Sequence, residues 1–149
     1  MITLEQGLKD RQMNKNQKKN SILLCLDLEE GSRELAECCN QSALDWDWPV
    51  QVLHVHSNEE QGIEDAESYL NAIVKETLDK VNVSTVKIVI GTPEEQIIEF
   101  ANEIVNAPII MLGRRKRTIA DRIYVGSTTS AVISLSTYPV IVVPLNSLK

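Results

Sequence analysis

Two short segments near the C-terminus combine the residue types that bind phosphate. The apolar run Ile109–Leu112 leads into Gly113, which is followed by the basic residues Arg114–Lys116. After nine further residues, Gly126 precedes the three hydroxyl residues Ser127–Thr129. This pattern is typical of a strand end, a loop and a helix N-terminus, where unpaired N–H groups and hydroxyls attract anions. The spacing therefore predicts a phosphate cradle that would lie over the phosphates of a nucleotide.

An acidic residue, Asp27, ends an apolar run in the first third of the chain. Ligands of open parallel sheets bind beyond the carboxyl ends of the strands, where the winding direction reverses. If the strand order is 3-2-1-4-5, Asp27 and Gly113 face one crevice at that point. Asp27 could accept hydrogen bonds there from a base or a ribose. The alternative is a turn or helix-capping aspartate, which is common after a strand.

The other polar groups have structural as well as functional interpretations. The basic run Arg114–Arg117 could contact phosphates, or it could be a solvated loop neutralised by an acidic body. Ser127 is expected to cap the following helix, which is compatible with anion binding. His54 and His56 share a strand face, but no third metal ligand is evident, so packed or hydrogen-bonded residues are expected. No catalytic motif appears, and neither a catalytic residue nor a metal site is predicted.

The elements that must position these residues alternate between strand and helix. The expected strands are residues 21–27, 50–56, 85–90, 107–112 and 140–143, and the expected helices are 32–44, 62–82, 92–105 and 127–136. Continuous apolar strands that alternate with helices predict a parallel sheet with right-handed crossovers, covered on both faces. Thr92, Pro93 and Glu95 predict a capping box at the start of the third helix, whose buried stripe would reach Val105. Pro144 is expected to stop the last strand.

Length and composition favour one soluble domain. The expected domain covers residues 21–144 of 149, with a mobile basic tail at 1–20 and a short tail at 145–149. The formal net charge of -6 argues against a general nucleic-acid binder. No apolar run reaches membrane-spanning length and no secretory signal is evident, so a cytoplasmic location without membrane association is expected. Cys25 and Cys39 are predicted to be core residues, with Cys38 partly exposed.

Taken together, these motifs resemble the universal stress protein family. The family signature is glycine, two residues, glycine, nine residues, glycine and then serine or threonine, and here it is Gly113-x2-Lys116-x9-Gly126-Ser127. The run Gly91–Pro93 before a helix and the final strand Pro139–Val143 also resemble the family. The resemblance covers residues 21–144. Lysine replaces the middle glycine, where the loop backbone approaches phosphate, but its charge could reach a phosphate itself.

The resemblance implies a single open sheet of order 3-2-1-4-5 in an adenine nucleotide alpha hydrolase-like fold. It also implies a homodimer through the edge strand Val140–Val143 and, for one branch of the family, bound ATP or AMP without obligatory chemistry, with Mg only alongside ATP. The implied ligand-binding positions are Asp27, Val55, Leu112, Gly113, Gly126, Ser127, Thr128 and Thr129. Lys116 is added as a ninth position because of its charge. Two alternatives stay open, namely a dimeric interaction protein that binds no nucleotide and an enzyme of a related fold such as a nucleotidyl transferase. The loop Leu28–Gly31 lacks the glycine-rich or histidine-containing motif of such transferases.

Overall fold

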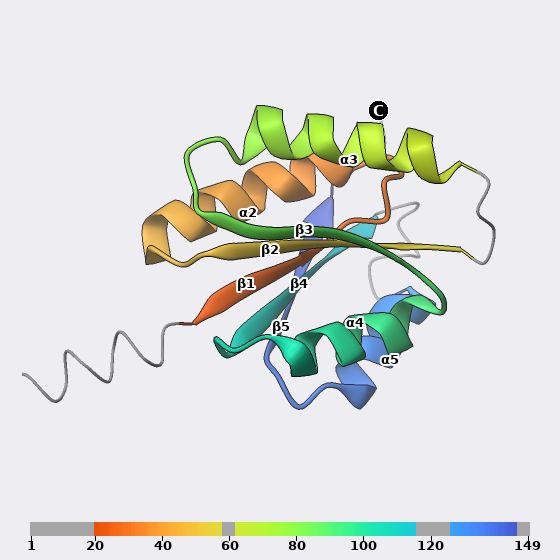
Figure 1. Ribbon diagram of the computed structural model, residues 1–149. Coiled ribbons are helices and arrows are strands. Elements are labelled where there is room, and N and C mark those ends of the chain that lie inside the picture. The colour runs from red at the N-terminus through yellow and green to blue at the C-terminus, as the bar shows by residue number, and fades with distance from the viewer. Residues whose placement is uncertain (1–19, 58–61, 116–125, 146–149) are drawn as a thin grey trace, which may run out of the picture.

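One five-stranded parallel sheet organises the chain (Figure 1). The computed structural model describes residues 20–57, 62–115 and 126–145, so the expected basic tail up to residue 19 and Lys116 lie outside the described residues. The strands are β1 (Ser21–Cys25), β2 (Val50–His56), β3 (Val83–Ile90), β4 (Pro108–Arg115) and β5 (Val140–Leu145). Their order is β3-β2-β1-β4-β5, and every neighbouring pair is parallel. The predicted strand order and fold class are confirmed.

Two helices cover each face of the sheet (Figure 1). The helices are α2 (Ser32–Trp46), α3 (Ile63–Thr77), α4 (Pro93–Glu103) and α5 (Ser127–Leu135). Leu24 and Val52 pack into the cluster that includes α2 and α3, whereas Leu23 and Leu53 pack into the cluster that includes α4 and α5. Successive residues of a strand point to opposite faces, so the continuous apolar strands supply both core layers.

The central strand β1 places Asp27 at the site. All five residues of β1 are buried, and it pairs with β2 on one side and β4 on the other. The Leu26 N–H extends the ladder by donating to the Leu53 carbonyl oxygen at 3.0 Å. Asp27 is therefore the first exposed residue beyond the carboxyl end of the strand.

The last strand extends beyond the predicted stop at Pro144. β5 runs through Pro144 to Leu145, and Leu145 is only 4% exposed. A proline lacks an N–H donor, but an edge strand tolerates it because one side of the strand has no partner strand in the sheet. The predicted end of the strand is wrong for this reason. Leu145 is a core residue in the segment that was expected to be a tail.

Several helix ends also differ from expectation. α3 ends at Thr77, before the expected residue 82, and α4 ends at Glu103. Val105 is 99% exposed, so the prediction that it belongs to a buried stripe is wrong. The chain must turn there to enter β4, and Pro108 disfavours helix in the residue before it. Thr92 is the N-cap of α4 but makes no side-chain cap hydrogen bond, so the predicted capping box does not form. Gly126, which has no side chain to accept such a bond, is the N-cap of α5 in place of the expected Ser127.

Candidate functional site

A cavity of about 440 Å³ lies at the carboxyl ends of the central strands. It is enclosed by the residues that follow β1 and end β4, by side chains of β2 and α4, and by the first turn of α5. The lining includes eight of the nine predicted site residues, Asp27, Val55, Leu112, Gly113, Gly126, Ser127, Thr128 and Thr129. The ninth, Lys116, lies outside the described residues. The parallel pairing of β1 with β4 thus brings the acid and the glycine-hydroxyl segment to one cavity.

The cavity has an apolar wall and a polar end. Val55, Pro93 and Ile97 line one part, together with Leu53 from β2. Apolar side chains of this kind can hold an aromatic base, because burial of apolar surface is favourable and non-directional. The hydroxyl residues of α5 and the arginines that end β4 line another part. A ligand with an apolar ring and an anionic or hydroxyl-rich tail would match both parts.

The polar end contains a helix N-terminus. The first backbone hydrogen bond of α5 runs from the Ser130 N–H to the Gly126 carbonyl oxygen at 2.9 Å. The amides of Ser127–Thr129 precede this bond, and such N-terminal amides have no partner within their helix. Of these three residues, Ser127 is exposed and Thr129 is buried. A Cβ placed on Gly126 would meet no atom of the described residues within 4 Å.

Gly113 has a packing role that the sequence did not indicate. A Cβ at this position would lie 2.6 Å from Leu145 Cδ1 and 3.3 Å from Leu35 Cδ2. Gly31 has the same neighbour, since its Cβ would lie 2.9 Å from Leu145 Cδ1, and its φ of +95° suits glycine. Both glycines therefore make room for Leu145, which lines the cavity from the end of β5. The packing of Leu145 is thus enough to explain why residue 113 is a glycine, without the close approach of a ligand.

Asp27 organises the loop that joins β1 to α2. Its Oδ1 accepts hydrogen bonds from the Glu29 N–H at 2.9 Å and from the Ser32 hydroxyl at 3.2 Å. The same loop contains Leu28 at a φ of +62°, a left-handed conformation that is uncommon outside glycine. Asp27 is therefore a turn aspartate, as the structural interpretation expected. It also lines the cavity, and its side chain is 59% exposed.

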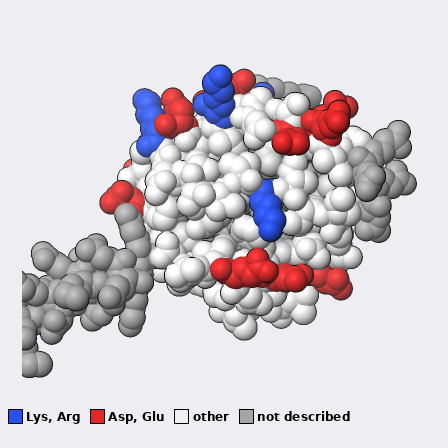
Figure 2. Space-filling view, in the orientation of Figure 1, with Lys and Arg blue, Asp and Glu red and all other residues white. Residues whose placement is uncertain are grey.

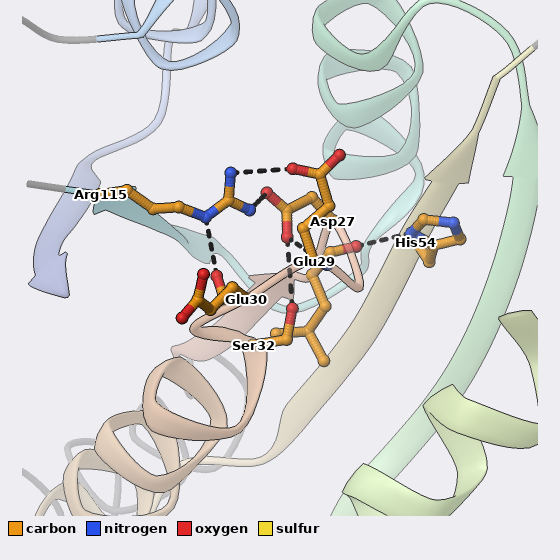
Figure 3. Close-up of polar contacts among 7 residues, drawn as sticks. Asp27, Glu29, Glu30, Ser32, His54 and Arg115 are labelled. Atoms are coloured by element: carbon orange, nitrogen blue, oxygen red, sulfur yellow. Dashed lines mark hydrogen bonds and ion pairs between the residues drawn. The ribbon is translucent and has the colours of Figure 1, made fainter. Parts of the chain in front are cut away.

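Arg115, the last residue of β4, crosses to this loop (Figure 3). Its guanidinium forms an ion pair with Asp27 Oδ2 and a second one, at 2.9 Å, with Glu29 Oε2. Its Nε donates to the Glu30 carbonyl oxygen at 2.7 Å. The Arg115 side chain is 21% exposed, but the Asp27 and Glu29 side chains are 59% and 70% exposed, so solvent and salt screen these ion pairs. The expected neutralisation of the basic run by acids thus holds at Arg115.

Sequence reasoning did not find this network, because its partners are 88 residues apart. The signal that could have found it is the predicted pairing of the first and fourth strands. That pairing places a basic residue just beyond Gly113 next to the acids that follow Asp27.

His54 fixes the chain on the other side of Asp27. Its Nδ1 lies 2.7 Å from the Leu26 carbonyl oxygen, so Nδ1 carries the proton and donates. Burial lowers the pKa of His54, and the hydrogen bond to Leu26 opposes this shift without reversing it. His54 is thus the hydrogen-bonded strand residue that was expected. Among the described residues, no three or more histidines, cysteines or acids gather where they could hold a metal ion.

On the face drawn in Figure 2, the lysines and arginines of the described residues do not gather into a basic patch. A row of acidic side chains runs along the lower part of this face, where α4 carries Glu94, Glu95, Glu99 and Glu103. A nucleic-acid backbone would be repelled by such a row. None of the described helices is long and apolar enough to cross a membrane.

Comparisons with known proteins agree with this geometry. A family model described as "Universal stress protein family" matches residues 19–144. None of the curated protein sequences compared with the chain matches it.

Solved structures share the fold over nearly the whole of their own chains. The structure of hypothetical protein MJ0577 is 27% identical, with a TM-score of 0.71 over 89% of this chain and 99% of that one. The universal stress protein from Archaeoglobus fulgidus in complex with dAMP is 22% identical, with a TM-score of 0.64 over 84% of this chain and 98% of that one. A universal stress protein in complex with cAMP is 18% identical, with a TM-score of 0.64 over 85% and 98% of the two chains.

Proposed function

The chain belongs to the universal stress protein family, and from this premise we propose that it binds an adenine nucleotide, AMP or ATP, without obligatory chemistry. The observation that carries the proposal is the cavity itself. It combines apolar side chains of β2 and α4 with the N-terminus of α5, at the point where the sheet reverses its winding. Structures of the same fold with bound dAMP and cAMP support the same ligand class.

Each predicted site residue has a role in this proposal. Val55 packs against the base, and Asp27 accepts a hydrogen bond from the ribose. Leu112 and Gly113 form the floor between ribose and phosphate. The amides and hydroxyls of Ser127–Thr129, which follow Gly126, bind the phosphate. Lys116 adds charge from outside the described residues, and Mg accompanies the ligand only when it is ATP.

The biological role proposed is that of a stress-response signalling domain whose nucleotide occupancy is the signal. Sequence reasoning predicted no catalytic residue. Cys25, a potential nucleophile in the cavity lining, is buried, and burial raises the pKa of its thiol far above the ordinary range. A buried neutral thiol is a poor nucleophile. A binding function therefore fits the cavity better than an enzymatic one.

Assembly is the second part of the proposal. β5 is one edge of the sheet, and Val140–Val143 are half-buried within a single chain. An apolar edge strand is a hazard unless something pairs with it or covers it. We propose that two copies pair through this edge in an isologous homodimer.

The competing possibility is a dimer of this fold that binds no nucleotide. One observation favours it, because Asp27 already accepts hydrogen bonds from Glu29, Ser32 and Arg115. A carboxylate has about four acceptor positions, so Asp27 retains room for about one more bond. A single ribose hydroxyl would fill it.

Calorimetric titration with AMP and with ATP at low ionic strength tests the proposal. The wild-type chain should bind one nucleotide per chain. Gly126→Phe should abolish binding without unfolding the domain, since Gly126 lines the cavity and a Cβ there meets no atom of the described residues within 4 Å. Ser130→Phe is the matched control, because Ser130 is exposed on the same helix and does not line the cavity. Absence of binding to the wild type, or equal binding by Gly126→Phe, would favour the nucleotide-free dimer.

A further inference from the structure

Arg115 lines the cavity, yet its guanidinium is directed at the β1–α2 loop (Figure 3). Three of its nitrogens each have a separate acceptor on that loop, namely Asp27, Glu29 and the Glu30 carbonyl. Charge-assisted bonds of this kind are the strong ones among hydrogen bonds, and arginine geometry suits such forked contacts. Arg115 is therefore held by the protein in the absence of any ligand.

The acids that Arg115 contacts would otherwise oppose a phosphate. Asp27 lines the same cavity as the N-terminus of α5, and Glu29 is tied to it through the Arg115 guanidinium. Glu29 does not line the cavity itself, but its charge adds to that of Asp27, and negative charge near an anion site raises the free energy of a bound phosphate, the more so the greater the charge of the ligand. One guanidinium placed between them removes much of this repulsion.

We propose that Arg115 determines whether the cavity accepts a phosphorylated ligand, by neutralising Asp27 and Glu29 rather than by contacting the phosphate. The inference rests on the proposed nucleotide function and deepens it. Arg115 is then a specificity-determining residue, because it sets the preference for nucleotides over uncharged nucleosides. Arg115 would act by neutralising the acids, so replacing one acid with a neutral residue should compensate for the loss of Arg115.

A series of ligands that differ in charge tests this mechanism. Affinities of the full-length chain for adenosine, AMP and ATP are measured at low ionic strength, where charge effects are least screened. Arg115→Met should weaken ATP binding about tenfold or more, AMP binding less, and adenosine binding by no more than about twofold. A purely structural collapse would weaken all three ligands alike, which would overturn the proposal. Arg115→Lys keeps the charge but not the forked contacts, and should give an intermediate loss for ATP.

Rescue by a second substitution separates neutralisation from direct contact. Arg115→Met combined with Glu29→Gln should recover most of the lost ATP affinity, because the uncompensated acid is gone. Glu30→Gln in the same background is the matched control, since Arg115 contacts only the Glu30 backbone. It should recover much less. If Glu29→Gln gives no rescue, Arg115 contacts the phosphate itself and the proposal is wrong.

Failure of the inference is distinct from failure of the proposed function. If the wild type binds neither AMP nor ATP, the nucleotide function fails, and with it the basis of the inference. If the wild type binds both and Arg115→Met binds them equally well, only the inference fails. Circular dichroism and thermal unfolding of each variant establish that the compared proteins are folded.

Discussion

Asp27 stabilises a loop and also lines the cavity. The sequence offered two interpretations, a ligand acceptor or a turn aspartate, and the bonds to Glu29 and Ser32 establish the second. The first remains compatible with them, because the same carboxylate lines the cavity. The loop is thus folded by the residue proposed to meet the ligand, and Arg115 shares that carboxylate from the end of β4.

His54 should make stability depend on pH in a defined direction. Burial lowers the pKa of His54 in the folded chain, so the unfolded chain binds the proton more readily. The free energy of unfolding should therefore fall as pH drops below about 6.5, the unfolded value, until the folded pKa is passed. Urea unfolding of the wild type between pH 8 and 5 measures this slope.

His54→Asn should flatten that slope, because its amide can still donate to the Leu26 carbonyl but does not titrate. His56→Asn, which leaves His54 in place, is the control and should retain it. Equal slopes in the wild type and His54→Asn would show that His54 does not carry the effect.

The two signature glycines that the structure describes should differ in their effect on stability. Gly113→Ala places a Cβ against the buried Leu145 and should lower the free energy of unfolding by about 1–3 kcal/mol, the usual cost of overpacking. The Cβ of Gly126→Ala meets no atom within 4 Å in the part of the chain that the structure describes, so this variant should stay within about 0.5 kcal/mol of wild type. Denaturant unfolding measures both. A Gly113→Ala protein as stable as the wild type would show that Leu145 moves aside freely.

At the scale of elements, the alternation of apolar runs and helical periods predicted every strand and helix that the structure describes. What it could not predict were the ends. Val105 fits the helical period of α4 but lies past its end, and Pro144 was expected to stop a strand that continues to Leu145. Both outcomes depend on tertiary context, namely the turn into β4 and the position of β5 at an edge. The pairing of Arg115 with the β1–α2 loop also depends on the sheet, and no local pattern contains it.

Val142→Lys should separate the proposed dimer, because it places a charge in the middle of the β5 edge. Val86→Lys is a matched control, since Val86 is 38% exposed on β3 at the opposite edge of the sheet. Light scattering over a wide range of concentration should show a dimer for the wild type and for Val86→Lys, and a monomer for Val142→Lys. A wild-type chain that remains monomeric across that range would contradict pairing through β5.

For the whole molecule, sheet order and family were predictable because the motifs occur at fixed points of a repeating strand-helix pattern. The eight positions implied by the family likeness line one cavity, and their role in binding a ligand stays a prediction. The charge balance of that cavity was not predictable from the sequence, because it depends on which acid each arginine contacts.

The most direct test of the nucleotide site is a titration of the isotopically labelled full-length chain with AMP, followed by backbone amide NMR shifts at low ionic strength. Binding in the proposed cavity predicts saturable shifts at Asp27, at Leu112 and Gly113, and along Ser127–Thr129, with α3 unchanged. A spectrum that does not respond to AMP, or responds only at residues distant from the cavity such as those of α3, would contradict the proposed site.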